Sequence, residues 1–321
     1  MTTQRPEVMI TRPFYPASME WLEREYTTYR LFEAPDRDAM LREVGSRIQA
    51  IAGGGAVDAA LFGALPALRL VAYVGVGYEQ VDVASAVQRG IVVTNTPGVL
   101  NDAVADLALS LLLAAERRIV TADAFVRAGE WPAGGFPFTR HLGDLTLGIV
   151  GLGRIGLEVA HRAEAFGMTI AYHNRNPRSG VAYAYHPDLL GLAQASDILL
   201  CVVPGGSETR HLVTEDVLRA LGPTGTFVNI ARGSVVDEAA LVRCLQEGAL
   251  GAAALDVFDR EPAVPQELFA LDNVVLTPHI GSATHSTRKA MGDLAVQNVL
   301  ALIGGRPLLS PVAECAALTP R

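Results

Sequence analysis

The sequence predicts an α/β protein with two parallel-sheet domains, of which the second is doubly wound, with helices on both faces of its sheet. Three observations predict this fold. An apolar run over residues 147–150 leads directly into a Gly-x-Gly-x-x-Gly turn. Short apolar segments alternate with amphipathic ones before and after that turn. The chain has 321 residues, half of them hydrophobic, and is about twice as long as a typical domain.

The first hundred residues predict the smaller sheet. Five apolar segments typical of strands alternate with amphipathic stretches there: Val8–Ile10, Thr27–Leu31, Ile48–Ala52, Leu68–Val74 and Ile91–Thr94. The fourth of them runs into the sequence Val-Gly-Val-Gly-Tyr over residues 74–78. Two glycines at the end of a strand form either a backbone-lined anion pocket or merely a tight turn, and the sequence leaves both open.

A long apolar helix is predicted over residues 101–118, after the break at Thr96-Pro97-Gly98. A loop rich in glycine, proline and aromatic residues follows over residues 129–138, which we call the Trp131 loop. It is expected to be an irregular surface loop. The helix and the loop together present more apolar surface than one small domain readily buries. They therefore predict a homodimer.

The glycine-rich turn itself predicts a dinucleotide site. Gly151 permits a tight turn, Gly153 has no side chain to hold the backbone away from a pyrophosphate, and Gly156 lets the next helix pack closely on its strand. Three glycines at this spacing are weak evidence alone, but a strand before them and a helix after them strengthen the prediction. We expect the pyrophosphate at the start of this helix, in contact with Arg154 and Ile155.

From residue 147 onward strands and helices alternate regularly. The further strands are predicted over Thr169–His173, Asp197–Val203, Thr226–Ala231, Gly251–Val257 and Asn273–Thr277. In such a sheet ligands bind beyond the carboxyl ends of the strands. The residues at those ends are Asn174, Pro204, Arg232, Asp256 and His279. The last segment, from about Ser286 to the C-terminus, is predicted to be helical.

Three side chains near these strand ends are candidates for chemistry. The planar guanidinium of Arg232 is suited to hold a carboxylate with two hydrogen bonds, although an interdomain ion pair is the alternative. His279 can donate or accept a proton near neutral pH, but a lone histidine at a strand end is more often structural. Glu261 can accept the other ring N–H and orient the imidazole, or is otherwise a surface carboxylate.

The segment after the second strand of the doubly wound sheet predicts the choice of dinucleotide. Residues 173–178 read His-Asn-Arg-Asn-Pro-Arg, and no aspartate or glutamate occurs between residues 164 and 188. Asn174, Arg175 and Asn176 can bind a 2′-phosphate, while no carboxylate is at hand for a 2′-hydroxyl. NADP(H) is therefore predicted over NAD(H), which remains possible. The remaining predicted cofactor contacts are loop residues near strand ends: Pro204, Ile230, Ala231, Asp256 and Gly281.

The composition argues against nucleic acid and membrane partners. The formal net charge is −8, and no basic run is present. The longest apolar stretch, residues 107–115, is far shorter than the roughly 20 residues that a bilayer requires. Three scattered cysteines predict no disulfide framework, and residues 1–7 lack the apolar core of a signal peptide. No metal site is expected. A cytoplasmic protein is expected.

Four motifs in order carry a resemblance to a known family: the glycine-rich turn, Ala231-Arg-Gly233, Arg260-Glu-Pro262 and the segment 278–284, Pro-His-Ile-Gly-Ser-Ala-Thr. Over nearly the whole chain they resemble the D-isomer-specific 2-hydroxyacid dehydrogenases. The resemblance implies two Rossmann-like domains: a flavodoxin-like substrate-binding (catalytic) domain made of residues 1–98 and 286–321, and a dinucleotide-binding Rossmann domain, residues 99–285, inserted between them.

The resemblance also implies roles for individual residues. Arg232 would bind the substrate carboxylate and carbonyl, and Glu261 and His279 would form the proton-relay pair. The backbone of Val76 and Gly77 would make the second contact with the carboxylate. These roles agree with those expected from the residues alone.

Within the family the chain is most similar to reductases of glyoxylate and hydroxypyruvate and of hydroxyphenylpyruvate, through residues 73–78, 288–291 and 306–309. We therefore expect NADPH-dependent reduction of small 2-keto acids, with glyoxylate and hydroxypyruvate first and phenylpyruvate or hydroxyphenylpyruvate as the alternative. Walls for the substrate side chain are expected near Ala52–Gly55 and in the Trp131 loop of a neighbouring subunit. Nucleotide-sensing corepressors also resemble this family, but extra tails for partners would be expected of them, so catalysis is favoured.

Overall fold

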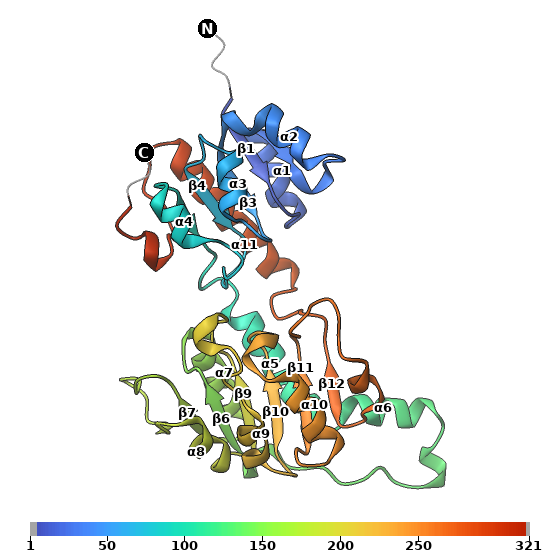
Figure 1. The fold of residues 1–321 in the computed structure, drawn as a ribbon. Coiled ribbons are helices and arrows are strands. Elements are labelled where there is room, and N and C mark those ends of the chain that lie inside the picture. The colour runs from blue at the N-terminus through green and yellow to red at the C-terminus, as the bar shows by residue number, and fades with distance from the viewer. Residues whose placement is uncertain (1–4, 319–321) are drawn as a thin grey trace. The chain divides into compact units, whose positions relative to one another are not determined.

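A computed structural model describes residues 5–318, and the chain divides into two compact units. The first unit combines residues up to Leu100 with those from Thr284 onward, and the second unit runs from Asn101 to Ala283. Each unit contains one parallel sheet (Figure 1). The predicted α/β class is confirmed, and a strand is present at every apolar segment that predicted one.

The sheet of the first unit has the order β2-β1-β3-β4-β5, which is the flavodoxin-like order. Its strands are β1 Glu7–Ile10, β2 Thr27–Arg30, β3 Ile48–Gly53, β4 Leu70–Tyr73 and β5 Val92–Thr94. Its helices are α1 Pro16–Glu25, α2 Arg37–Val44, α3 Ala59–Ala64, α4 Val83–Gln88 and α11 His285–Ile303. The helices α2, α3 and α4 each begin after an aspartate whose carboxylate accepts a hydrogen bond from a first-turn amide, at Asp36, Asp58 and Asp82.

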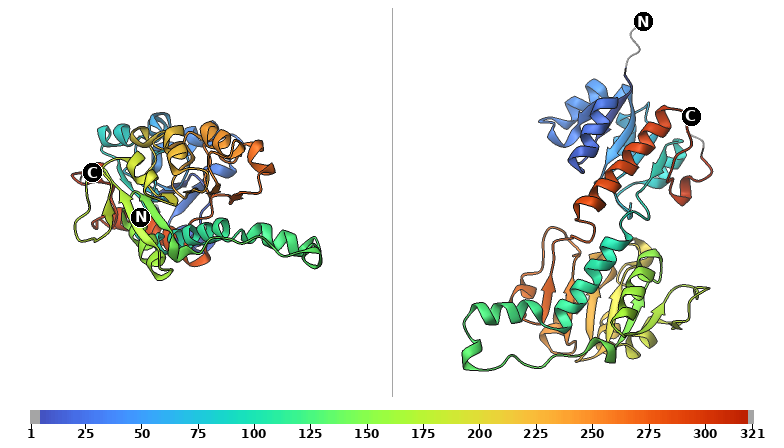
Figure 2. Two further views of the ribbon diagram at one scale, coloured as in Figure 1. Left: turned by 90° about the horizontal axis from the view of Figure 1, so that it is seen from below. Right: turned by 180° about the vertical axis from the view of Figure 1, so that it is seen from behind.

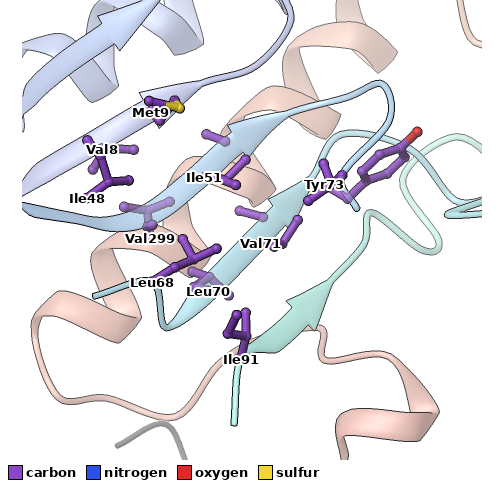
Figure 3. Close-up of a cluster of buried hydrophobic side chains, with 14 of the residues drawn as sticks. Val8, Met9, Ile48, Ile51, Leu68, Leu70, Val71, Tyr73, Ile91 and Val299 are labelled. Carbon is purple, nitrogen blue, oxygen red and sulfur yellow. The ribbon is translucent and has the colours of Figure 1, made fainter. Parts of the chain in front are cut away.

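The C-terminal helix α11 belongs to the first unit and lies along its sheet (Figure 2). Val299 of α11 joins Met9, Ile51 and Val71, from strands β1, β3 and β4, in one buried cluster (Figure 3). The prediction that this helix continues to the C-terminus is wrong. It ends at Ile303, because two glycines and a proline follow within four residues and cannot continue it; the last three residues of that prediction lie outside the described ones.

The sheet of the second unit has the order β12-β11-β10-β9-β6-β7-β8, and all its strands are parallel. Its strands are β6 Thr146–Val150, β7 Thr169–His173, β8 Ala184–Tyr185, β9 Ile198–Cys201, β10 Thr226–Asn229, β11 Ala252–Leu255 and β12 Val274–Leu276. The chain changes direction across the sheet between β6 and β9. This is the switch point at which doubly wound sheets bind nucleotides.

The helices of the second unit are α5 Asn101–Glu116, α6 Ile119–Arg127, α7 Arg154–Ala165, α8 Leu189–Gln194, α9 Glu215–Leu221 and α10 Glu238–Gln246. The single helix predicted over residues 101–118 ends early. Arg118 adopts a φ of 50°, in the left-handed region, and α6 begins after it. The predicted irregular loop beyond α6 contains a 3-10 turn over Trp131–Ala133. Among residues 5–318, no helix is long and apolar enough to span a membrane.

Helix α6 and the loop after it extend away from the rest of their unit (Figures 1 and 2). None of the α6 side chains is buried. Large apolar side chains are exposed along this extension: Ile119, Val120, Val126, Trp131 and Phe138. We call residues 119–138 the arm. Its apolar surface is not covered by the described chain.

Candidate active site

The glycine-rich turn joins β6 to α7 as predicted. Gly151 has a φ of 101°, and a Cβ there would lie 2.7 Å from Cγ1 of Val203. A Cβ at Gly156 would lie 2.4 Å from the carbonyl oxygen of Gly151, so the helix packs on the turn more closely than any side chain allows. Nothing lies within 4 Å of the Cβ position at Gly153. Close packing at Gly151 and Gly156 therefore makes the turn tight, whereas Gly153 leaves open space before the helix.

The start of α7 offers unsatisfied donors to that open space. The first hydrogen bond into the helix runs from the Leu157 amide to the Gly153 carbonyl, at 3.1 Å, and Gly153 provides no side-chain cap. The amides of Arg154 and Ile155 precede this bond, so they have no carbonyl within the helix. A helix N-terminus with such donors binds a phosphate group.

The loop after β7 supports the glycine-rich turn through two side chains. Asn174 Oδ1 accepts a hydrogen bond from the Leu152 amide at 2.7 Å, and Arg178 Nη1 donates to the Leu152 carbonyl at 3.0 Å. Asn176 and Arg175 are exposed. Arg175 forms an ion pair with Glu208, from the loop after β9.

The loops after β9 and β10 complete this edge of the sheet. The Pro204 carbonyl accepts a hydrogen bond from the Thr209 hydroxyl at 2.7 Å. Ile230 and Ala231 are buried, and the Ile230 amide donates to the Cys201 carbonyl at 3.3 Å.

Burial raises the pKa of the Cys201 thiol, which therefore stays protonated at neutral pH and is no nucleophile.

Arg232 lies at the start of the short turn after β10, half-buried, and its Nη1 donates to the Ala231 carbonyl at 2.7 Å. The next residue, Gly233, brings this turn into direct contact with the loop that follows β11. A Cβ at Gly233 would lie 1.9 Å from the carbonyl carbon of Phe258. The loop that holds Arg232 is therefore packed against the loop that carries Glu261.

His279 and Glu261 form the pair that the sequence predicted. Nδ1 of His279 lies 2.7 Å from Glu261 Oε2, and the other oxygen of Glu261 accepts a hydrogen bond from the Phe258 amide at 3.1 Å. The carboxylate is thus held by its own loop and in turn orients the imidazole. With Nδ1 engaged, Nε2 is the ring nitrogen left to exchange a proton with a ligand.

A buried carboxylate shapes the backbone around His279. Asp256 is 1% exposed, and its two oxygens accept hydrogen bonds from the Thr277 hydroxyl at 2.6 Å and from the amides of Ile280 and Gly281 at 2.8 and 2.9 Å. His279 itself adopts a φ of 53°, in the left-handed region. Asp256 and Gly281, both predicted as cofactor contacts, are therefore joined in a network that fixes the turn of His279.

The glycine loop after β4 in the first unit contains a residue that our reading of the sequence missed. Asn95 Nδ2 donates to the Val76 carbonyl at 2.8 Å, and the Thr96 amide donates to the Gly75 carbonyl at 2.9 Å. In a trans peptide the amide points opposite to the carbonyl. Both contacts therefore turn the amides of Val76 and Gly77 away from residues 95–96, in a common direction.

Two adjacent amides with a common direction are the donors that a backbone anion pocket requires, which favours the first of the two alternatives left open for this loop. Asn95 belongs to the sequence Asn-Thr-Pro-Gly, which we interpreted only as a break before a helix. Its role depends on β4 and β5 lying side by side, and no local signal indicates it.

The second unit brings most of the predicted site residues to one edge of its sheet. Arg232, Glu261 and His279 follow the neighbouring strands β10, β11 and β12 in turn. The glycine-rich turn and Asn174 follow β6 and β7 at the same edge, because the carboxyl ends of parallel strands coincide. Val76 and Gly77 belong to the first unit. Residues 5–318 contain no group of acidic, histidine and cysteine side chains that could hold a metal ion.

Comparisons with known proteins agree with this geometry. Residues 109–281 match the family model described as D-isomer specific 2-hydroxyacid dehydrogenase, NAD binding domain. The chain is 46% identical over 293 residues to a glyoxylate/hydroxypyruvate reductase A from Arabidopsis thaliana, covering 91% of this chain and 94% of the relative. It is also 46% identical, with the same coverage, to a hydroxyphenylpyruvate reductase from Plectranthus scutellarioides.

A solved structure is similar over almost all of both chains. It is the NADPH-dependent glyoxylate/hydroxypyruvate reductase from Sinorhizobium meliloti in complex with NADP and malonate. The TM-score is 0.90 at 44% identity, and the match covers 99% of each chain. Together with the matched family model, this likeness shows that the chain belongs to the D-isomer-specific 2-hydroxyacid dehydrogenase family.

Proposed function

We propose that this enzyme reduces small 2-keto acids, with glyoxylate and hydroxypyruvate as good substrates and NADPH as the preferred cofactor. The single observation that carries the proposal is the contact between His279 and Glu261, at 2.7 Å, on the same sheet edge as Arg232 and the glycine-rich turn. An oriented acid, an arginine and a dinucleotide turn are the parts that carbonyl reduction needs.

The residues of the site have distinct tasks in this reaction. Bound NADPH supplies the hydride to the keto carbon. His279, protonated and held by Glu261, donates its proton to the carbonyl oxygen, and a 2-hydroxy acid results. Arg232 binds the carboxylate and polarises the carbonyl. We assign the second contact with the carboxylate to the amides of Val76 and Gly77, whose common direction suits an anion.

The two units divide these tasks in the proposal. Residues 1–98 and 286–321 form the substrate-binding domain, and residues 99–285 form the dinucleotide-binding domain. The first unit supplies the backbone anion loop, and the second supplies the acid, the arginine and the cofactor turn.

The preference for NADPH is supported by Arg175 and Asn176, which are exposed beside the glycine-rich turn, and by Asn174 in the same loop. A 2′-phosphate there gains charge-assisted hydrogen bonds. NAD(H) lacks this phosphate and remains a possible, poorer cofactor. Asn174 also holds the turn through Leu152, so its replacement would affect both cofactors, whereas Arg175 distinguishes them.

The substrate side chain distinguishes two classes of 2-keto acid, short and aromatic. Relatives of equal identity are named for hydroxypyruvate and for hydroxyphenylpyruvate, so their names do not choose between short and aromatic substrates. The test is kcat/KM with NADPH for glyoxylate, hydroxypyruvate, phenylpyruvate and hydroxyphenylpyruvate. We expect the two short acids to lead. An aryl pyruvate preferred by more than about tenfold, or roughly 1.4 kcal/mol, would reverse this order.

We further propose that the enzyme is a cytoplasmic homodimer. The arm exposes apolar side chains on a helix that buries none, and a second copy of the chain is the partner that would cover them. The Trp131 loop would then lie near the substrate site of the partner subunit. The three cysteines are free and buried, as suits a reducing compartment.

A further inference from the structure

Arg12 lies at the sheet edge that carries the backbone anion loop. It follows β1, which pairs with β3, and β3 in turn pairs with β4. Because these strands are parallel, Arg12, the glycines 53–55 and the loop at Val76 and Gly77 leave the same edge of three adjacent strands.

The residue before Arg12 ties its loop to the glycines. The Thr11 amide donates to the Ala52 carbonyl at 3.1 Å, and the Thr11 hydroxyl donates to the Gly54 carbonyl at 2.9 Å. These two hydrogen bonds hold the end of β1 against the loop after β3. The backbone from which the Arg12 side chain starts is therefore well placed with respect to that loop.

The side chain of Arg12 crosses from β1 onto the loop after β3. A Cβ at Gly55 would lie 2.8 Å from Nε of Arg12 and 3.2 Å from its Cδ. Gly53 and Gly55 have φ values of 128° and 85°, which favour glycine. Nothing lies within 4 Å of the Cβ position at Gly54. The glycines thus give the guanidinium a surface to lie on and leave open volume beside it.

The Arg12 side chain is exposed. No carboxylate among residues 5–318 forms an ion pair with it. Other arginines of the same unit do have such partners, for example Arg47 with Glu7 and Arg30 with Glu23. An uncompensated guanidinium beside open volume is suited to bind an anion from solution.

We propose that Arg12 forms a second anion subsite, and that the enzyme therefore accepts 2-keto acids that carry a second carboxylate at their far end. This inference rests on the proposed function. The keto acid's own carboxylate would lie on the amides of Val76 and Gly77. The Arg12 side chain lies over the loop of β3, one strand spacing of about 4.8 Å from β4, which a short carbon chain can span.

The experiment compares substrates that differ in the far carboxylate. The probes are 2-ketoglutarate and 2-oxopentanoate, which have carbon chains of equal length, and glyoxylate, which has no carbon beyond the carbonyl. With NADPH, the wild-type kcat/KM for 2-ketoglutarate should exceed that for 2-oxopentanoate by about tenfold or more, as expected of a charge-assisted contact. In Arg12→Gln, kcat/KM should be about equal for 2-ketoglutarate and 2-oxopentanoate. The kcat/KM for glyoxylate should stay within about twofold of wild type.

Arg89→Gln is the matched control. Arg89 is also exposed and belongs to the same unit, but it precedes β5 and so lies at the opposite end of the sheet. The Arg89→Gln variant should have the wild-type kcat/KM for all three substrates. The subsite is refuted if wild type shows no preference for the second carboxylate, if Arg12→Gln lowers glyoxylate and 2-ketoglutarate equally, or if Arg89→Gln has the same effect as Arg12→Gln.

A binding measurement separates the failure of this subsite from the failure of the proposed function. Succinate and butyrate have equal carbon chains and need no turnover. In the presence of NADPH, calorimetry should give a lower Kd for succinate than for butyrate in wild type. In Arg12→Gln the Kd values of the two acids should be equal. If no keto acid is reduced while this difference persists, the proposed function fails and the subsite stands. Equal Kd values in wild type overturn the subsite alone.

Discussion

Glu208 Oε2 lies 3.1 Å from Nη1 of Arg175, although the two residues are 33 positions apart. The pair joins the loop after β9 to the loop after β7. No carboxylate lies near Arg175 in the sequence, but the fold supplies one from another loop. Both side chains are largely exposed, so the pair is weak. If Arg175 binds the 2′-phosphate, as we propose, the phosphate competes with Glu208 for the arginine.

We therefore expect Glu208→Gln to raise kcat/KM for NADPH by roughly twofold to fivefold, which corresponds to the free energy of an exposed ion pair. The kcat/KM for NADH should not change. Arg175→Ala should do the opposite and penalise NADPH selectively. Steady-state kinetics with both cofactors check the two variants. An equal change for NADPH and NADH in Glu208→Gln would show that the pair does not face the 2′-phosphate.

Removal of the imidazole should slow turnover without loss of the cofactor. His279→Ala is expected to lower kcat by about 10² to 10⁴, which is the usual contribution of a positioned acid. NADPH binding, followed by its fluorescence, should stay close to wild type. Glu261→Gln should cost less, because an amide oxygen can still accept the ring N–H. Turnover of a folded His279→Ala variant at the wild-type rate would remove the histidine from the mechanism.

Asn95 should control substrate binding through the direction of two amides. Asn95→Ala leaves the Val76 carbonyl without its donor and frees the peptide to turn, so KM for glyoxylate should rise by about tenfold with a smaller change in kcat. Asn95→Asp should be worse, because a carboxylate cannot donate to Val76 and repels the substrate. Urea unfolding provides the control. An unchanged KM in a stable Asn95→Ala protein would contradict the assignment.

Gly233 should tolerate no side chain. In Gly233→Ala the new methyl group would overlap the Phe258 carbonyl, and a cost of about 1–3 kcal/mol in the free energy of unfolding is expected from such overpacking. Displacement of the loop that carries Glu261 should also lower kcat. Gly63→Ala is the matched control, since it lies in α3 with nothing within 4 Å of its Cβ position. It should stabilise the protein by roughly 0.5–1 kcal/mol.

The arm should mediate self-association. Light scattering at micromolar concentration is expected to give twice the chain mass of 34.0 kDa. Val126→Glu places a charge on the exposed apolar face of α6 and should produce monomers without unfolding, because Val126 is 53% exposed in the single chain. A wild-type mass near 34.0 kDa would contradict the dimer.

The sequence by itself determined those features that depend on local conformation. The alternation of apolar segments indicated the strands, and the spacing of Gly151, Gly153 and Gly156 indicated the turn at the switch point. These signals are local, because backbone φ and side-chain periodicity are set by neighbours in the chain. The short strand β8 has only two residues, too few for any period, and it was therefore not predicted.

Only the tertiary structure decided which distant residues meet. Glu208 beside Arg175, Asn95 beside Val76, and the Arg12 side chain on Gly55 all join loops that follow different strands. The order of strands in a sheet decides such neighbours, and a single sequence does not display that order in any local pattern. The physical reason is that these contacts are made across the sheet, between residues whose separation in the chain says nothing about their separation in space.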